Sequence, residues 1–293
     1  MSSSTGLGPP WDDIRRVIES ALDEDLPSGD LTGAAIGPKP ARARLVPRQA
    51  GTLSGLVAAQ LLLDRVANRL GSGSARARLS SADASPVERE EVLAVLEGPA
   101  DTLLAGERAL LNLVGHLSGV ATATAAMVKA VAGTGAVVRD TRKTLPGLRS
   151  LEKYAVRCGG GSNHRMSLSD GVLVKDNHVA AMGSVKAALE AARRSAGPAS
   201  RVPFLVEVEV DNLRELDEAL AGGAELVLLD NMPRQDLVTA VARARAAGAR
   251  TEASGGIQLG NIRAVAECGV DYIAVGALTH SAPALDIGLD WEI

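Results

Sequence analysis

From about residue 136 onward, short runs of β-branched and aliphatic residues alternate with amphipathic segments. Runs of this kind are typical of buried strands. They occupy residues 136–141, 171–176, 204–210, 225–231, 250–256 and 272–278. Apolar positions at helical spacing, in several cases followed by Gly, predict helices at 184–196, 212–223, 233–248 and 259–269. The alternation predicts parallel strands covered by helices, as in a (β/α) barrel or a doubly wound sheet.

Each expected strand has a polar residue or a glycine near the point where it ends. These residues are Arg142, Lys143, Lys175, Asp176, Glu209, Asp230, Ser254 and Gly276. The carboxyl ends of barrel strands form the active face, so this shared placement favours a barrel with its site at that end. Six clear strands are fewer than a complete barrel needs. We therefore expect an open, incomplete (β/α) barrel over residues 116–280.

The first part of the chain has a different pattern. A helix is expected to begin at Asp12 or Asp13, with Asp as its N-cap. Short antiparallel strands are expected in three segments that flank a helix at 56–70: 41–55, 75–85 and 90–98. We expect residues 12–115 to form a small α+β, sandwich-like domain, joined to the barrel by a helix over about 106–132. Residues 1–11 are expected to be a disordered tail, and residues 281–293 to pack back toward the first domain.

Composition excludes several classes of protein. The chain has 293 residues, of which 46% are hydrophobic, but only two Trp, two Tyr and one Phe. Readers of single-stranded nucleic acid need aromatic platforms, so we expect no nucleic-acid partner. Cys158 and Cys268 lie far apart without metal-ligand spacing, which indicates reduced thiols in a cytoplasmic protein. The apolar segment 111–128 is too polar for a membrane span, and the N-terminus lacks the features of a secretory signal.

Positive charge is concentrated in one region of an acidic chain. Residues 142–178 contain seven Lys or Arg against three Asp or Glu, whereas the remainder contains 24 against 32. We interpret part of this charge as the solvated face of a helix over 148–157, on which four side chains pair at helical spacing: Arg149, Glu152, Lys153 and Arg157. The other positions fall at strand ends or beside glycines, and we interpret them as functional. They are Arg142, Lys143, His164, Arg165 and Lys175.

Three glycine-containing segments are candidate anion sites. Residues 158–163 give backbone N–H groups room to approach an anion, although a plain flexible loop is an equally good interpretation. This segment lacks the Lys-Ser/Thr ending of a nucleotide triphosphate loop. Residues 253–257 and 274–278 each follow a strand and precede a helix, as in the phosphate sites of late barrel loops.

Acidic residues complete the candidate site. Glu207 and Glu209 share one face of a strand because strand side chains alternate. Together with Asp230, Glu209 could bind ribose hydroxyls, or a Mg²⁺ ion that is held mainly by substrate phosphates. The other interpretation is that Glu209 forms an internal salt bridge with Lys143 or Lys175. His164 is the best catalytic candidate among the histidines. We interpret His178 as a loop or capping residue, and His116 and His280 as packing residues.

Cationic loops, glycine-rich donors and carboxylates together indicate a small polyanionic substrate with phosphates and a metal. Several long motifs then closely resemble the quinolinate phosphoribosyltransferase family. They include residues 140–178, "EVEVDN" (207–212), "LVLLDNM" (226–232), "EASGGI" (252–257) and residues 270–290. The likeness extends to residues 21–32 and 107–122, so it covers nearly the whole chain after the tail.

The resemblance implies an enzyme that joins quinolinate to phosphoribosyl pyrophosphate, giving nicotinate mononucleotide, CO₂ and pyrophosphate in NAD biosynthesis. It implies that the quinolinate carboxylates are bound by Arg142, Arg165 and Lys175, with His164 nearby. It implies a homodimer or hexamer in which Arg108 reaches across a dimer interface into the substrate site of the neighbouring subunit. It implies that Lys143, Glu209 and Asp230 hold the phosphoribosyl donor with Mg²⁺. The 5′-phosphate would be bound by Ser254, Gly255, Gly256 and Gly276, and Thr141 and Ala277 belong to the same substrate site.

Two other functions remain open from the sequence. One is a related pyridine or phosphoribosyl transferase of the same fold, a group that includes the molybdenum-transport-associated relatives. Such an enzyme would consume nicotinate as well as quinolinate, or would release no CO₂. The other is a non-catalytic anion-sensing barrel, which would bind phosphoribosyl pyrophosphate without forming nicotinate mononucleotide.

Overall fold

The computed structural model of the chain describes residues 8–196 and 206–292. The described residues form two compact units. The first unit draws on Met1–Ala125, Thr144–Gly160 and Leu278–Ile293, and the second on Ala126–Lys143 and Gly161–Ala277. This division differs from the expected boundary between residues 115 and 116, because one continuous helix, α4 (Ala100–Ala130), runs through that position.

The second unit contains a parallel sheet of six strands. They are β6 (Val137–Arg139), β7 (Val172–Val174), β8 (Val206–Val210), β9 (Leu226–Asp230), β10 (Arg250–Ser254) and β11 (Tyr272–Ala274). Their order is β6-β11-β10-β9-β8-β7, and every neighbouring pair is parallel. Among the described residues β6 and β7 are the two edges, so the barrel is open, as predicted. Two residues of the expected strand at 204–210, residues 204 and 205, lie outside the described residues.

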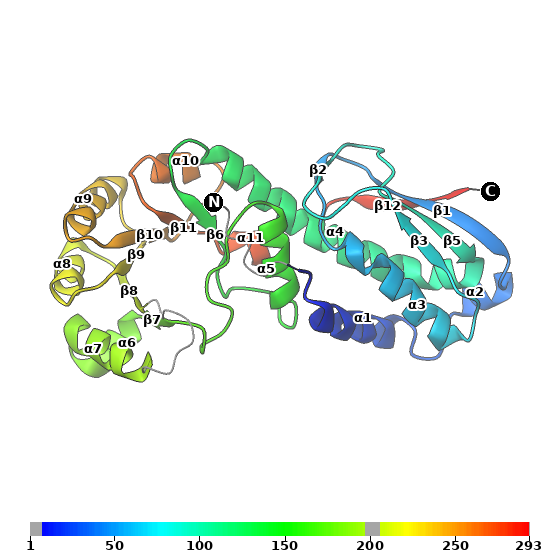
Figure 1. Ribbon diagram of the computed structural model, residues 1–293, viewed down its shortest axis with the longest axis horizontal. Helices are drawn as coiled ribbons and strands as arrows, with labels where there is room; N and C mark the ends of the chain where they lie inside the picture. Colours follow the sequence, from blue (N-terminus) through cyan, green and yellow to red (C-terminus); the bar gives the residue numbers. More distant parts are fainter. Residues whose placement is uncertain (1–7, 197–205, 293) are drawn as a thin grey trace. The chain divides into compact units, whose positions relative to one another are not determined.

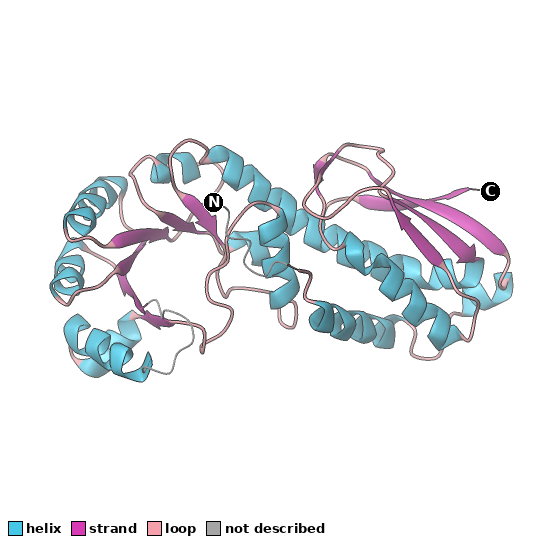
Figure 2. Cartoon of the chain, in the orientation of Figure 1, coloured by secondary structure: helices cyan, strands magenta, loops and turns pink. Residues whose placement is uncertain are grey.

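Helices cover the outside of this sheet, as Figures 1 and 2 show. They are α6 (Asp176–Met182), α7 (Val185–Ala196), α8 (Leu213–Ala221), α9 (Arg234–Ala246) and α10 (Ile262–Ala266). Local sequence sets where they begin: the Asn212 side chain accepts a hydrogen bond from the Glu215 N–H at 3.0 Å and caps α8. His178 takes the predicted capping role, since its Nδ1 accepts the Lys175 N–H at the start of α6, at 2.9 Å.

The first unit is an antiparallel sheet with helices packed against it. The sheet has the order β12-β1-β5-β3. Its strands are β12 (Ile287–Glu292), β1 (Pro40–Pro47), β5 (Ala94–Pro99) and β3 (Arg76–Leu79), and a separate pair is formed by β2 (Gly51–Thr52) and β4 (Pro86–Val87). The helical elements are α1 (Trp11–Asp25), α2 (Leu31–Ile36), η1 (Leu56–Ala58), α3 (Ala59–Leu70), α4, α5 (Arg149–Cys158) and the short α11 (Ala277–His280) at the junction with the second unit. α3 packs on the sheet and α1 on α3, which agrees with an α+β unit (Figure 2).

The chain's last strand lies in the first unit's sheet. β12 pairs with β1 in a register that runs from Arg42 opposite Glu292 to Pro47 opposite Ile287. The expected return of residues 281–293 to the first domain therefore takes the form of a strand, which the hydrophobic pattern did not predict.

The predicted start of α1 is wrong by one or two residues. The helix begins at Trp11 and its N-cap is Pro10, with no side-chain cap. Asp12 and Asp13 lie in the first turn, where negative charge is favourable next to unpaired N–H groups. Asp13 also pairs with Arg16 at 2.5 Å. Pro10 has φ −78° and ψ 74°, which is not a helical conformation, so the helix begins at the next residue.

The solvated face predicted for residues 148–157 is also wrong. Glu152 and Lys153 of α5 are fully buried. The Glu152 carboxylate bonds the His116 Nε2 at 2.9 Å and accepts the Leu145 N–H at 3.1 Å. His116, expected to be a packing residue, is thus the side-chain partner of a buried carboxylate. Charged residues become buried when hydrogen bonds replace the lost water, and helical spacing alone does not reveal such partners.

By length and composition α4 could cross a membrane, although a core helix of a soluble protein passes the same test. Half of its most apolar 18-residue window is buried inside the protein. Some of its polar side chains bond residues outside the helix: the Ser118 hydroxyl accepts the Ser54 N–H at 3.0 Å, and the Thr122 hydroxyl accepts the Thr52 N–H at 2.8 Å. These contacts agree with the interpretation of residues 111–128 as part of a protein-covered helix. Cys158 and Cys268 are both free thiols, as predicted.

Candidate active site

A cavity of about 350 Å³ opens at the carboxyl ends of the second unit's strands. It is lined by Thr141, Arg142, Lys143, His164, Arg165, Leu173, Lys175, Glu209, Leu228, Asp230, Glu252, Ser254 and Ala274. The parallel sheet explains this gathering, because all its strands end at the same edge. Nine of the residues that the sequence selected for substrate, phosphate or metal therefore share one hollow.

Four cationic side chains give this cavity its chemical character: Arg142, Lys143, Arg165 and Lys175. Arg165 is partly buried, and its Nη1 donates to the Gly171 carbonyl at 2.9 Å. Burial, followed by the charge of Arg142, lowers the pKa of Arg165. An anion between the two guanidinium groups would relieve this repulsion, so the cavity favours a ligand with several negative charges.

Glu209 and Lys175 form an ion pair inside the cavity, with 2.5 Å between Oε2 and Nζ. This is the internal salt bridge that the sequence left open as one of two interpretations. The Glu209 side chain is mostly buried, whereas that of Lys175 is 45% exposed. A substrate carboxylate can therefore compete for the Lys175 ammonium from the open side.

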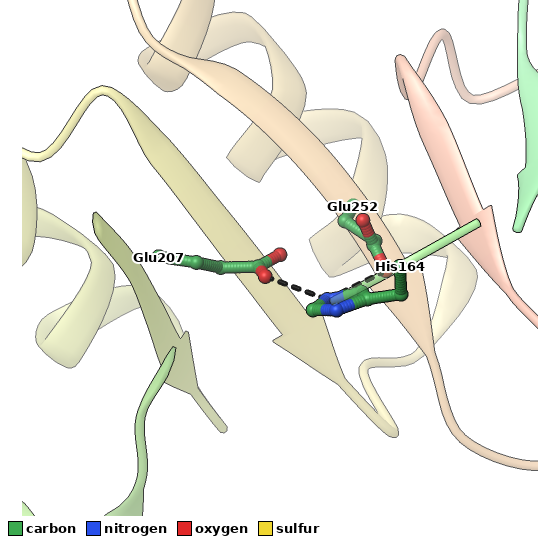
Figure 3. A group of neighbouring side chains, drawn as sticks. All are labelled: His164, Glu207 and Glu252. Atoms are coloured by element: carbon green, nitrogen blue, oxygen red, sulfur yellow. Dashed lines mark hydrogen bonds and ion pairs between the residues drawn. The ribbon is translucent and has the colours of Figure 1, made fainter. Parts of the chain in front are cut away.

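A network of buried charges lies beside these residues (Figure 3). Glu252 accepts from Arg139 Nη1 at 2.5 Å, and its other oxygen is 3.7 Å from the His164 Nε2. The same ring nitrogen lies 2.8 Å from Glu207 Oε2. Burial, and then the charge of Glu207, raises the pKa of Glu252 to about 7. Among the described residues this His and the two Glu form one group close enough to hold a metal. Because their contacts are hydrogen bonds and Arg139 already occupies one carboxylate, we interpret the group as a hydrogen-bond network.

His164 is held in place from both sides of its ring. The Arg165 N–H donates to Nδ1 at 2.8 Å, so the ring proton lies on Nε2 and is donated to Glu207. Its own N–H donates at 2.8 Å to Asp140, a fully buried side chain that also bonds Asn163. The loop between α5 and β7 is thereby fastened to the end of β6.

Sequence reasoning missed Arg139, Asp140 and Glu252. Glu252 lies two positions before Ser254, and strand alternation puts both on one face. The same rule connects Arg139 with Thr141. The period of two was therefore a usable signal for Arg139 and Glu252, but attention to the strand ends alone left the positions two residues earlier out of the predicted site.

The glycine segments have different structural roles. Gly159 ends α5, and a Cβ there would lie 2.4 Å from the Ala121 carbonyl oxygen. Close packing on α4 therefore accounts for this glycine. Gly255 has φ +95°, and a Cβ there would lie 2.1 Å from the Asn231 Oδ1. Asn231 in turn donates to the Asp230 carboxylate at 2.7 Å.

Four predicted substrate-binding residues do not line the cavity wall. They are Gly255, Gly256, Gly276 and Ala277, which follow the lining residues Ser254 and Ala274 by one to three positions. Arg108 belongs to the first unit, where it lines a different cavity of about 220 Å³ together with His116 and Leu148. Its predicted place in a partner's site stays a prediction.

Comparison with known proteins decides the family. The model of the quinolinate phosphoribosyl transferase C-terminal domain matches residues 120–290, and that of the N-terminal domain matches residues 30–118. The chain belongs to the quinolinate phosphoribosyl transferase family. The family's two domain models meet within two residues of each other inside α4, a few positions after the expected boundary.

Relatives within this family cover the chain almost completely. The carboxylating nicotinate-nucleotide pyrophosphorylase of Mycobacterium leprae is 48% identical over 285 residues, which are 96% of this chain and 98% of that protein. The human protein of the same name is 39% identical and covers 94% of this chain and 91% of its own. The solved nicotinate-nucleotide pyrophosphorylase of Francisella tularensis has a TM-score of 0.87 at 36% identity, covering 98% of both chains.

Proposed function

We propose that this chain catalyses the reaction for which its relatives are named, joining quinolinate to phosphoribosyl pyrophosphate with loss of CO₂ and pyrophosphate. The observation that carries the proposal is one cavity that combines four cations with carboxylates at the strand ends. Quinolinate brings two carboxylates, and the sugar donor brings a phosphate and a pyrophosphate. A site for such ligands needs fixed positive charge on several sides.

Quinolinate binding falls to the part of the cavity formed by Arg142, Arg165 and Lys175. Guanidinium groups bind a carboxylate with two parallel hydrogen bonds, whereas an ammonium acts as a point charge. Binding would draw Lys175 from Glu209 to the substrate and free the Glu209 carboxylate for the sugar donor. His164 lines the same cavity with its ring orientation fixed, and so limits where the pyridine can lie.

The sugar donor is assigned to Lys143, Glu209 and Asp230, with backbone donors of Ser254, Gly255, Gly256, Gly276 and Ala277 around its 5′-phosphate. The Glu209 and Asp230 carboxylates line one cavity, and oxygen ligands of this kind fit Mg²⁺ that is bound mainly through phosphates. When bound, Mg²⁺ supplies charge neutralisation of the departing pyrophosphate. Lys143 adds a second positive charge for the same oxygens.

The bonds then change in a fixed order. The C1–O bond of the sugar breaks toward pyrophosphate, and the pyridine nitrogen bonds to C1. The resulting positive nitrogen stabilises the electron pair that stays on the neighbouring ring carbon when CO₂ leaves, and this carbon then takes a proton. Alignment of the two substrates and fixed charge are the protein's main contributions.

We propose further that the protein is a cytoplasmic homo-oligomer in which Arg108 completes a partner's site. Arg108→Ala and Lys175→Ala proteins, each inactive alone, are expected to recover activity when mixed and reassociated. Failure of the mixture, with both variants folded, would overturn the shared site and leave the catalytic assignment intact.

The activity itself is tested with purified protein, Mg²⁺, phosphoribosyl pyrophosphate and quinolinate labelled in its 2-carboxylate. Nicotinate mononucleotide and labelled CO₂ are expected in equal amounts, and chelation of the metal is expected to remove most turnover. Consumption of nicotinate in place of quinolinate would assign a different transferase. Calorimetric binding of phosphoribosyl pyrophosphate without product would assign an anion sensor.

A further inference from the structure

One residue, Asn231, joins the ends of the two strands that carry most of the proposed sugar-donor site. It follows Asp230, the last residue of β9, and its N–H donates to the Ser254 carbonyl at the end of β10, at 2.9 Å. This bond continues the parallel ladder one step beyond its last paired residues, Asp230 and Ser254. The backbone of Asn231 therefore holds these two cavity residues in register.

The side chain of Asn231 contacts the Asp230 carboxylate directly. Its Nδ2 donates to Asp230 Oδ2 at 2.7 Å. Among the described residues this amide is the one protein donor to the Asp230 side chain, so Oδ1 stays available to a ligand. An amide that donates to a carboxylate fixes the direction of the carboxylate without adding charge to the cavity.

Asn231 makes these contacts in a backbone conformation that most residues avoid. Its φ is +51°, in the left-handed region. Within the described part of the chain, only two other residues that are not glycine have a positive φ, Ala84 and Glu90. Asn adopts this conformation more readily than most residues, and strained backbone is frequent at ligand sites, where surrounding contacts hold it in place. An exposed residue that is held in this way is a candidate for a role in the neighbouring cavity.

The same amide lies against the glycine turn that follows β10. A Cβ at Gly255 would lie 2.1 Å from the Asn231 Oδ1 and 2.8 Å from its backbone nitrogen, so the amide occupies the space that a larger residue would need. On the other side of the turn, Asn261 Nδ2 donates to the Gly256 carbonyl at 3.0 Å. In the described chain neither the Gly255 nor the Gly256 N–H donates to a protein group, so both can bind a phosphate.

We propose that Asn231 is a positioning residue for the sugar donor. Its amide holds the Asp230 carboxylate in the direction that the ribose hydroxyls or the donor's metal require, and it fixes the Gly255 turn beside the 5′-phosphate. A carboxylate at position 231 would repel Asp230 instead of donating to it. This role rests on the proposed function and adds a residue that orders the sugar-donor part of the cavity without contacting the quinolinate part.

Two variants separate the amide from the backbone that carries it. Asn231→Gly removes the amide and keeps the left-handed conformation, which glycine adopts without strain. Asn231→Asp keeps the shape of the side chain but replaces the donor with a second carboxylate. Ala84→Gly is the matched control, because Ala84 is also exposed and has a φ of +70°, but belongs to the first unit.

The first test measures KM for both substrates, kcat and Tm. In Asn231→Gly, KM for phosphoribosyl pyrophosphate is expected to rise about tenfold, the factor that a hydrogen bond to a charged group contributes, and in Asn231→Asp it is expected to rise further. KM for quinolinate and the Tm of Asn231→Gly should change little, and Ala84→Gly should leave both KM values unchanged. A merely structural role would instead lower Tm and raise both KM values alike. That result, or an unchanged KM for phosphoribosyl pyrophosphate in both Asn231 variants, would overturn the proposal.

The second test needs no turnover. Calorimetry with phosphoribosyl pyrophosphate and Mg²⁺ is expected to give a Kd that rises in both Asn231 variants by about the same factor as KM, and that is unchanged in Ala84→Gly. Equal Kd values in the natural protein and both Asn231 variants would refute the positioning role. If the natural protein forms no nicotinate mononucleotide but the Kd difference remains, the result counts against the proposed reaction alone.

Discussion

Replacement of Glu252 by Gln should change how the stability of the protein depends on pH. In the folded protein the pKa of Glu252 is raised from its ordinary value of 4.5 to about 7. The folded chain therefore binds this proton more tightly than the unfolded chain. The stabilisation is complete below about pH 4.5, is lost as pH rises toward 7, and does not change further above that pH. The total loss is about 3 kcal/mol, since one pKa unit corresponds to about 1.4 kcal/mol.

Urea unfolding, followed by circular dichroism, measures this loss directly. The free energy of unfolding of the natural protein minus that of Glu252→Gln is expected to fall by about 2.5 kcal/mol between about pH 5 and pH 8. Glu225→Gln, which changes an exposed carboxyl group, should show no such difference. A difference between the natural protein and Glu252→Gln that stays constant with pH would mean that Glu252 is ionised throughout, and our reading of the network would fail.

Two glycines give further predictions. A Cβ at Gly119 would lie 2.1 Å from the Pro283 carbonyl oxygen, so Gly119→Ala should destabilise the first unit by about 1–3 kcal/mol and lower its calorimetric Tm, whereas Gly260→Ala, with open space around it, should not. An unchanged Tm would show that the Pro283 segment can move away. Gly255→Ala should displace Asn231 from Asp230 and raise KM for phosphoribosyl pyrophosphate about tenfold or more, with a smaller effect on KM for quinolinate. Equal rises in the KM values for phosphoribosyl pyrophosphate and for quinolinate would contradict the assignment of Gly255 to the phosphoribosyl pyrophosphate part of the cavity.

Local sequence patterns were sufficient to predict the strands of the second unit and the end of the sheet at which its cavity lies. Its strands are short apolar runs with a polar residue or a glycine near each end, and parallel pairing brings those ends together without further information. Lys143, Lys175 and Glu209 could therefore be assigned to one cavity before any coordinates were known.

The remaining features depend on partners that are distant in the sequence. Glu152 looked like part of a solvated helix face, because its partner His116 lies 36 positions earlier on another helix. β12 has a weak apolar pattern and becomes a strand through its pairing with β1 at the other end of the chain. Arg139 and Glu252 are separated by 113 positions, and only the fold shows that this guanidinium pairs with a buried carboxyl group.

The pairing of β12 with β1 has a consequence for synthesis of the protein. β1 lies between β12 and β5, and β12 (Ile287–Glu292) follows all the strands of the second unit in the sequence. Until β12 has been synthesised, β1 presents an open backbone edge. The unit that is made first is thus the last to be completed. A chain that stops before β12 would keep all six strands of the parallel sheet and yet leave the β1 edge unpaired and open to other nascent chains.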